Sequence, residues 1–175
     1  MDNETLLIVK GERLDFREEV RSADRDHVRA IVSSTGFFSP EEIEIAVELV
    51  EERLARGPGS GYHFVFAEYG GRVVGYSCFG PIPGTRESYD LYWIAVHEAC
   101  RGLGIGTALL EESERRILRS GGRRVYVETS FRNQYGPTRA FYAARGYAQE
   151  ALLKDFYAPG DSKIIFSKTI PLNMI

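Results

Sequence analysis

The chain has few of the residues on which several classes of protein depend. Among its 175 residues are only two cysteines, Cys78 and Cys100, and three histidines. Two cysteines do not make a disulfide framework, and no spacing among the cysteines and histidines matches a metal-binding motif. The sequence therefore predicts no metal site. We interpret Cys78 as a small core residue of a strand.

An excess of basic charge and a long apolar run are also missing. The 22 basic and 25 acidic side chains give a net charge of −3, and no basic stripe suggests nucleic-acid binding. No run is long enough to cross a membrane, and the acids Asp2 and Glu4 do not suit a signal peptide. We therefore expect no nucleic acid or membrane as partner, and the cytoplasm is the simplest compartment.

Length and composition are typical of one soluble domain. Apolar residues make up 43% of the chain and charged residues 27%, and 175 residues can bury a sizeable core. We expect a single domain over 1–175, with 1–12 as a loose N-terminal arm.

The first half of the chain predicts a strand, two helices and a hairpin. The second helix has the clearest start, because Ser39, Pro40 and Glu42 make a capping box with proline in the first turn. Gly57 ends that helix. The expected elements are a strand over Leu14–Val20, a helix capped by Ser22 and ending near Ser34, the helix after Ser39, and strands over Tyr62–Glu68 and Arg72–Phe79.

The central stretch predicts a strand, a glycine loop and a helix. The strand covers Asp90–His97, the loop contains Gly102, Gly104 and Gly106, and the helix covers Thr107–Arg119. The first amides of a helix have no partner within it, and the helix dipole places partial positive charge there. Glycines let a ligand reach those amides, so the loop predicts a phosphate or pyrophosphate ligand.

The rest of the chain completes an α+β fold with a mixed sheet. The strand Arg124–Thr129 follows the central helix and should run parallel to the central strand, with a right-handed crossover. A short helix over Pro137–Arg145 comes next. Two last strands, Tyr147–Tyr157 and Lys163–Lys168, flank the turn Ala158–Asp161.

Two blocks of residues resemble one known family. Arg101-Gly-Leu-Gly104-Ile-Gly106 resembles the phosphate-loop signature of the GNAT superfamily of acyl-CoA-dependent N-acetyltransferases. Asn133, then Ala140-Phe-Tyr-Ala-Ala-Arg-Gly146-Tyr147, resembles the second GNAT block, although Thr138 replaces the usual alanine. The resemblance implies a central mixed sheet of about six to seven strands flanked by helices, with splayed parallel strands at the cofactor site.

The resemblance also implies how coenzyme A would be held, with no metal. Its pantetheine arm would pair with the backbone of the central strand, its pyrophosphate would lie on the glycine loop, and one asparagine would add a side-chain contact. The implied cofactor-binding residues are Ile94, Ala95, Val96, Arg101, Gly102, Leu103, Gly104, Ile105, Gly106, Thr107, Asn133 and Tyr142.

N-acetylation requires a base to deprotonate the ammonium and an acid to protonate the leaving thiolate. Tyr142 matches the family's tyrosine acid. Asp90 and Glu128 are both candidates for the base. Burial in a strand would raise the pKa of Glu128, whereas pairing with an arginine such as Arg132 would give it a structural role. The sequence does not decide between the two carboxylates.

We therefore interpret the chain as an N-acetyltransferase that moves an acetyl group from acetyl-CoA to a primary amine in a ternary complex. A non-catalytic acyl-CoA-binding module and an enzyme that uses a longer acyl donor are the alternatives. The acceptor loops would be Phe37–Phe38, Ile82–Ser88 and Asp155–Asp161. A protein amine, a polyamine, an aminoglycoside and an amino acid all remain open, and a homodimer paired through a sheet edge is compatible with the sequence.

Overall fold

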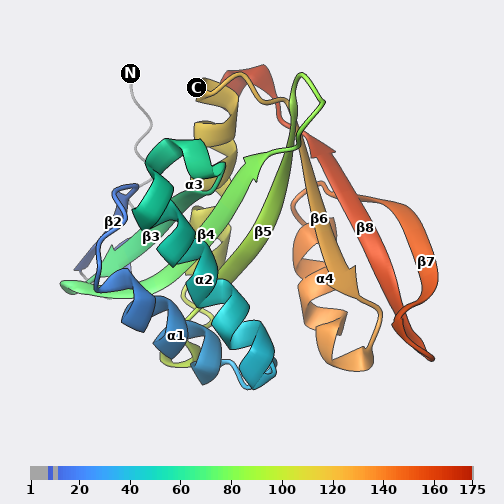
Figure 1. Cartoon of the computed structure of the whole chain (residues 1–175), viewed down its shortest axis with the longest axis horizontal. Coiled ribbons are helices and arrows are strands. Elements are labelled where there is room, and N and C mark those ends of the chain that lie inside the picture. The colour runs from blue at the N-terminus through green and yellow to red at the C-terminus, as the bar shows by residue number, and fades with distance from the viewer. Residues whose placement is uncertain (1–7, 10–11, 175) are drawn as a thin grey trace. The chain divides into compact units, whose positions relative to one another are not determined.

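The structure is a computed structural model that describes residues 8–9 and 12–174. Its strands follow the order β1-β2-β3-β4-β5-β6-β8-β7, which confirms the expected mixed α/β fold (Figure 1). The chain divides into two compact units. Unit 1 comprises Met1–Gly80 and Trp93–Ser113, and unit 2 comprises Pro81–Tyr92 and Glu114–Ile175. In the described part of the chain, no helix has both the length and the apolarity of a membrane span.

Unit 1 contains most of the N-terminal half of the chain. Its elements are β1 (Ile8–Val9), β2 (Glu12–Arg17), α1 (Asp24–Ser34), α2 (Pro40–Arg56), the 3-10 helix η1 (Gly57–Ser60), β3 (His63–Tyr69), β4 (Arg72–Pro81, up to Gly80), the second part of β5 (Ser88–Val96), the 3-10 helix η2 (Glu98–Cys100) and the first part of α3 (Ile105–Arg119). The strand expected over Leu14–Val20 thus begins and ends earlier, and β1 lies within the expected loose arm, of which residues 1–7 and 10–11 lie outside the described residues.

The core of unit 1 lies between its sheet and the pair α1 and α2. These two helices lie side by side on one face of β3 and β4 (Figure 1). Phe64 and Tyr76 project from the strands into this core, and Cys78 is fully buried there, as expected. The remaining buried helix residues of this core are Val28, Ile31, Val32, Ala46, Val47 and Val50.

The other face of the same strands contacts α3. A Cβ atom on Gly75 would lie 2.9 Å from Leu109 Cδ1 and 3.0 Å from the Ala95 carbonyl oxygen. Ser77 Oγ and Ser113 Oγ are 2.7 Å apart and both buried. Glycine at position 75 therefore allows the start of α3 to pack closely on β4 and β5.

The two N-terminal helices start in different ways. The capping box predicted for α2 is confirmed, since the Ser39 side chain accepts from the Glu42 amide and Glu42 accepts from the Ser39 amide. The cap predicted at Ser22 is wrong, because α1 begins after Ala23 without a side-chain cap. Asp24 instead accepts from the Arg21 amide at 2.7 Å.

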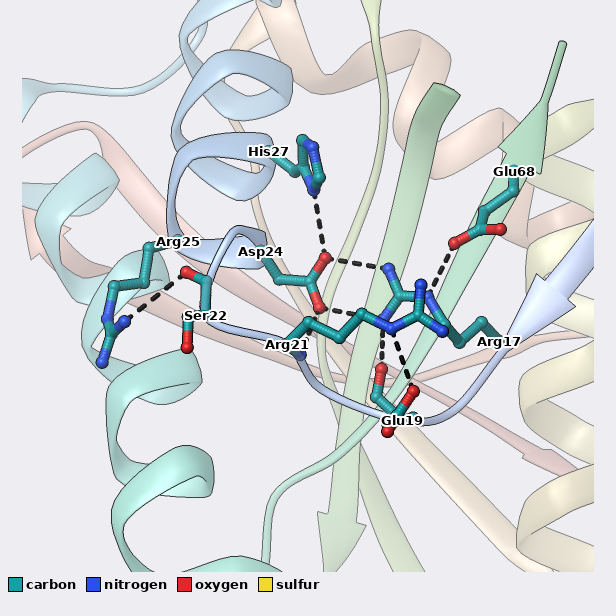
Figure 2. Close-up of polar contacts among 8 residues, drawn as sticks. All are labelled: Arg17, Glu19, Arg21, Ser22, Asp24, Arg25, His27 and Glu68. Carbon is teal, nitrogen blue, oxygen red and sulfur yellow. Dashed lines mark hydrogen bonds and ion pairs between the residues drawn. The ribbon is translucent and has the colours of Figure 1, made fainter. Parts of the chain in front are cut away.

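Asp24 is the centre of a buried charge network that joins α1 to the sheet (Figure 2). Arg17 on β2 donates to both Asp24 carboxylate oxygens at 2.9 Å and to Glu68 on β3 at 2.6 Å. His27 Nδ1 lies 3.1 Å from Asp24. This network replaces the expected hydroxyl cap of α1 with a buried ion pair.

Unit 2 contains the first part of β5, the second part of α3 and the C-terminal elements. These are β6 (Arg124–Ser130), the 3-10 helix η3 (Asn133–Tyr135), α4 (Gly136–Ala143), β7 (Ala148–Ala158), β8 (Asp161–Thr169) and the 3-10 helix η4 (Leu172–Met174). Strand β5 pairs with β6 in parallel over Ser88–Asp90, as predicted. Strands β7 and β8 form the C-terminal hairpin (Figure 1).

Side-chain alternation gives the sheet of unit 2 two chemically different faces. Val127 is opposite Phe166, and Glu128 is opposite Ile165, in the antiparallel register of β6 and β8. Val127 and Phe166 are buried together with Tyr142 of α4. Because successive side chains point to opposite faces, Glu128 and Lys163 lie on the face away from Tyr142.

Candidate active site

The predicted phosphate loop lies in unit 1, between η2 and α3. Gly102 and Gly104 adopt φ values of +73° and +80°, which L side chains rarely adopt, so glycine is required there by conformation. The helix begins at Ile105, two residues earlier than expected, so Gly106 belongs to its first turn. The Ala108 amide donates to the Gly104 oxygen at 3.1 Å, as in the first turn of an α-helix. The amides of Ile105 and Gly106 therefore have no partner within the helix.

The residues before the glycines fix the approach to this loop. Arg101 Nη1 lies 2.9 Å from Glu98 Oε2, and its guanidinium lies 5.2 Å from the Phe37 ring centroid. The Glu98 amide donates to Ser34 Oγ at 3.0 Å. His97 Nδ1 accepts from the Ala99 amide at 3.2 Å, which gives this histidine a structural role. An anion on the loop would have to compete with Glu98 for Arg101.

The strand residues predicted to hold the pantetheine arm, Ile94–Val96, form the end of β5 in unit 1. The His97 amide donates to the Val74 oxygen at 2.8 Å, which ties the end of the strand to β4. Trp93, the residue before Ile94 on β5, packs against Phe38 with 5.0 Å between ring centroids. Both aromatic residues thus contribute to the packing of unit 1.

Tyr142 lies in unit 2, on α4, and only 4% of it is exposed. Its ring makes edge contacts with Phe141 and Tyr147 at centroid distances of 5.3 and 5.4 Å, and it lies 6.2 Å from Phe166. Burial raises the pKa of the Tyr142 hydroxyl, so the group stays protonated at neutral pH. Tyr142 can therefore donate a proton but cannot serve as a resting base.

The two candidate bases lie on β5 and β6 of unit 2. Asp90 is partly buried, and its pKa is raised by burial and by the charge of Glu128, while the charge of Lys163 opposes the shift. The expectation of a buried Glu128 is wrong. Its side chain is 50% exposed and lies 2.6 Å from Lys163 Nζ, whereas Arg132 pairs with Asp161. The exposed side of β6 and the neighbouring lysine of β8 explain this difference.

Asn133, the predicted side-chain contact for the cofactor, begins η3 and is exposed. Its carbonyl oxygen accepts from the Gly136 amide at the start of α4. The side chain is thus presented to solvent from a short structured turn of unit 2.

Comparisons with known proteins decide the family. The profile of the Acetyltransferase (GNAT) family matches residues 28–147. An uncharacterized N-acetyltransferase from Methanocaldococcus jannaschii is 36% identical over 110 residues, which cover 62% of this chain and 67% of that protein. The chain belongs to the GNAT acetyltransferase family.

Solved structures agree with this assignment. A protein assigned to the GNAT family in Desulfovibrio desulfuricans is 47% identical, with a TM-score of 0.88 over 90% of this chain and 99% of its own. An aminoglycoside 6'-N-acetyltransferase complexed with coenzyme A has the same fold, with 20% identity and a TM-score of 0.72 over 90% of this chain and 97% of its own. The chain is therefore an acetyltransferase.

Two ion pairs of this GNAT protein, those of Glu114 and Lys163, could not be predicted from the sequence. Glu114 on α3 is 1% exposed and accepts from the Tyr147 hydroxyl at 2.9 Å and from Lys168 Nζ at 2.7 Å. Lys163 on β8 pairs with Glu128. Lys163 and Ile165 are two positions apart along β8, so the side-chain alternation of a strand places both on one face of the sheet. This pattern does not identify the partner of Lys163.

The described residues contain no group of three or more His, Cys, Asp or Glu side chains that could hold a metal ion. His63, in β3, stacks on Phe79 with 5.9 Å between ring centroids, and burial lowers its pKa. A neutral histidine packed on an aromatic ring is typical of a structural residue.

Proposed function

We propose that this enzyme moves an acetyl group from acetyl-CoA to a primary amine by direct attack. The observation that carries the proposal is the α3 N-terminus, where two left-handed glycines precede amides that have no partner within the helix. Such amides bind phosphate oxygens. The fold neighbour that contains coenzyme A supports the choice of a pyrophosphate-bearing donor.

Each candidate residue then has a chemical task. The amine nitrogen bonds to the acetyl carbon, the carbon–sulfur bond breaks, and coenzyme A leaves as a thiol after taking one proton. We assign delivery of that proton to Tyr142, whose raised pKa keeps it protonated. Removal of the ammonium proton falls to Asp90 or Glu128. The loop Arg101–Gly106, with Thr107 and Ile94–Val96, would hold the donor, and Asn133 would add a contact.

The faces of unit 2 support a division of labour between these groups. Tyr142 packs against Phe166 on one face of β8, while Glu128 and its partner Lys163 belong to the other. The ammonium of the acceptor loses one proton before attack, and the leaving thiolate of coenzyme A gains one, so the reaction needs two separate proton transfers. We assign the first transfer to Asp90 or Glu128 and the second to Tyr142.

The first experiment measures thermal unfolding with and without saturating acetyl-CoA. At a hundred times its dissociation constant the ligand adds about 2.7 kcal/mol to stability. For a chain of this length we expect Tm to rise by roughly 5–10 °C. The same preparation then acetylates members of a panel of primary amines, with coenzyme A release as the readout.

A pair of glycine variants shows whether the loop is responsible. Gly104→Val forces a side chain onto a φ of +80° and should abolish the ligand-induced shift. Gly121→Val places the same side chain at a φ of +87° in the turn after α3, with open space around it, and should keep the shift. If acetyl-CoA, free coenzyme A and longer acyl-CoA esters all leave Tm unchanged in the wild type, the proposed donor is wrong.

A further inference from the structure

The ammonium group of Lys163 lies between the carboxylate of Glu128 and the aromatic rings of Phe156 and Tyr157. The Lys163 side chain is only 11% exposed, and its Nζ lies 2.6 Å from Glu128 Oε2. The same atom lies 3.7 Å from the Phe156 ring centroid and 5.6 Å from that of Tyr157. A cation between a carboxylate and aromatic faces is held in one position.

The irregular end of β7 places these rings over the lysine. The register of β7 with β8 shifts between Leu153 and Ala158, and Asp155 adopts a φ of +53°. The Asp155 amide donates to Ser162 Oγ at 3.1 Å, and its carboxylate accepts from the Gly160 amide at 2.8 Å. An unfavourable backbone conformation is thus stabilised next to Lys163, on the strand that carries Phe156 and Tyr157.

The lysine pair shares a sheet face with Asp90. Asp90 is the register partner of Tyr126 on β6, and Glu128 is two residues further along that strand, so the three side chains point to one face. Lys163 lies on this face from β8. The ionised groups that act on Asp90 are thus Glu128 and Lys163, with Tyr126 as a further titratable group, while Asp161 is paired with Arg132.

We propose that Lys163 is a positioning residue for acetyl transfer: it fixes Glu128 as an ion-pair partner and leaves Asp90 as the group that accepts the proton of the amine. This inference rests on the proposed function. It assigns the base, which the sequence leaves open between the two carboxylates. The opposite charges of Glu128 and Lys163 both contribute to the electrostatic environment of Asp90.

The sign of each perturbation follows from the charges. The negative charge of Glu128 raises the pKa of Asp90, so Glu128→Gln should lower it. The positive charge of Lys163 lowers the pKa of Asp90, so Lys163→Met should raise it further. The two substitutions remove the two ends of one ion pair and yet should move Asp90 in opposite directions. Loss of packing alone has no reason to produce that pattern.

The test uses two readouts on the full chain. One is the pH dependence of kcat/KM for an amine found in the acceptor panel. The other is the titration of aspartate carboxyl carbons by NMR in protein without acetyl-CoA or amine, with the Asp90 signal assigned by its loss in Asp90→Asn. Lys163→Arg keeps the charge. Lys154→Met removes the charge of an exposed lysine on β7 and is the matched control.

We expect Lys163→Met to move the rising limb of kcat/KM and the Asp90 titration to higher pH, and Glu128→Gln to move both to lower pH. Lys163→Arg and Lys154→Met should show the same pH dependence of kcat/KM and the same Asp90 titration as the wild type. Asp90→Asn should lose the rising limb of kcat/KM. Lys163→Gln, which keeps part of the stem and a polar end, replaces the methionine variant if that variant does not fold.

Other outcomes overturn the inference. If Glu128→Gln loses the limb while Asp90→Asn keeps it, Glu128 is the base. If the Asp90 titration is unmoved in both the Lys163 and Glu128 variants, the ion pair does not act on Asp90. If the titration moves as stated but no amine is acetylated, the proposed function fails while the electrostatic coupling stands.

Discussion

Arg17→Met should destabilise the protein more than any single substitution of an exposed charge. Arg17 is 10% exposed, and Asp24, its partner through two hydrogen bonds, is fully buried (Figure 2). Arg17 also pairs with Glu68, and its guanidinium lies 4.5 Å from the Phe66 ring centroid. Methionine preserves much of the apolar volume but removes every polar contact, which leaves the buried carboxylate to the Arg21 amide and His27.

The size of the effect follows from the uncompensated charge. Removing one partner of a buried ion pair costs about 3–5 kcal/mol. In a chain of this length each kcal/mol lowers Tm by about 2–4 °C, so the expected loss is roughly 6–20 °C. The matched control is Arg56→Met, which breaks an exposed pair with Glu52 and should cost about 0–1 kcal/mol. Urea and thermal unfolding followed by circular dichroism measure both.

The pH dependence of the stability difference between the wild type and Arg17→Met tests whether the uncompensated charge of Asp24 causes the loss. Burial raises the pKa of Asp24, but hydrogen bonds from Arg17 and the Arg21 amide outweigh it, and the net pKa is lowered. A lowered folded-state pKa stabilises the fold above the unfolded value of about 3.9, and this stability is lost as pH falls through the folded pKa. The difference in the free energy of unfolding between the wild type and Arg17→Met should therefore become smaller at acidic pH. Asp24→Asn added to Arg17→Met should recover part of the loss. A gap equal to that of the control, or one independent of pH, would refute the reasoning.

Three further substitutions separate catalysis from folding. Tyr142→Phe keeps the ring but removes the acid, so kcat should fall by about 10²–10⁴-fold, with a much smaller change in the dissociation constant of acetyl-CoA. Steady-state kinetics and a binding titration measure the two effects. Gly75→Ala would place a methyl group 2.9 Å from Leu109 Cδ1 and should cost about 1–3 kcal/mol in urea unfolding. Ser39→Ala removes one half of the α2 capping box and should cost about 1 kcal/mol by the same measurement, with a loss near zero counting against the cap.

The parts of the fold that sequence predicted are those fixed by neighbours in the chain. The capping box of Ser39 and Glu42 involves residues three apart, and the two left-handed glycines are next to the helix that they introduce. The parallel pairing of β5 and β6 follows from a strand–helix–strand order. Each of these features depends on local geometry or on a connection rule, so each can be read from order and spacing.

The start of α1 shows why the rest could not be predicted. Ser22 is a good local cap, but Asp24 of α1 pairs with Arg17 of β2 and accepts from the Arg21 amide, so the helix begins without the serine. Glu128 is a second case, because alternation places it on a face without saying whether that face is covered. Its partner Lys163 is 35 positions away in the chain, on a strand whose register with β6 no sequence pattern specified.

Strand β8 supplies a lysine to each face of unit 2, and the two have parallel roles. Lys163 pairs with Glu128 on the face of Asp90, and Lys168 pairs with Glu114 on the face of Tyr142. Glu114 also binds the hydroxyl of Tyr147, whose ring packs against Tyr142. The proposed proton acceptor, Asp90, and the proposed proton donor, Tyr142, therefore each share a sheet face with a carboxylate that is paired with a lysine. Because Glu128 and Glu114 are each held in an ion pair, we expect Asp90 to be the carboxylate whose proton affinity is used in the proposed acetyl transfer.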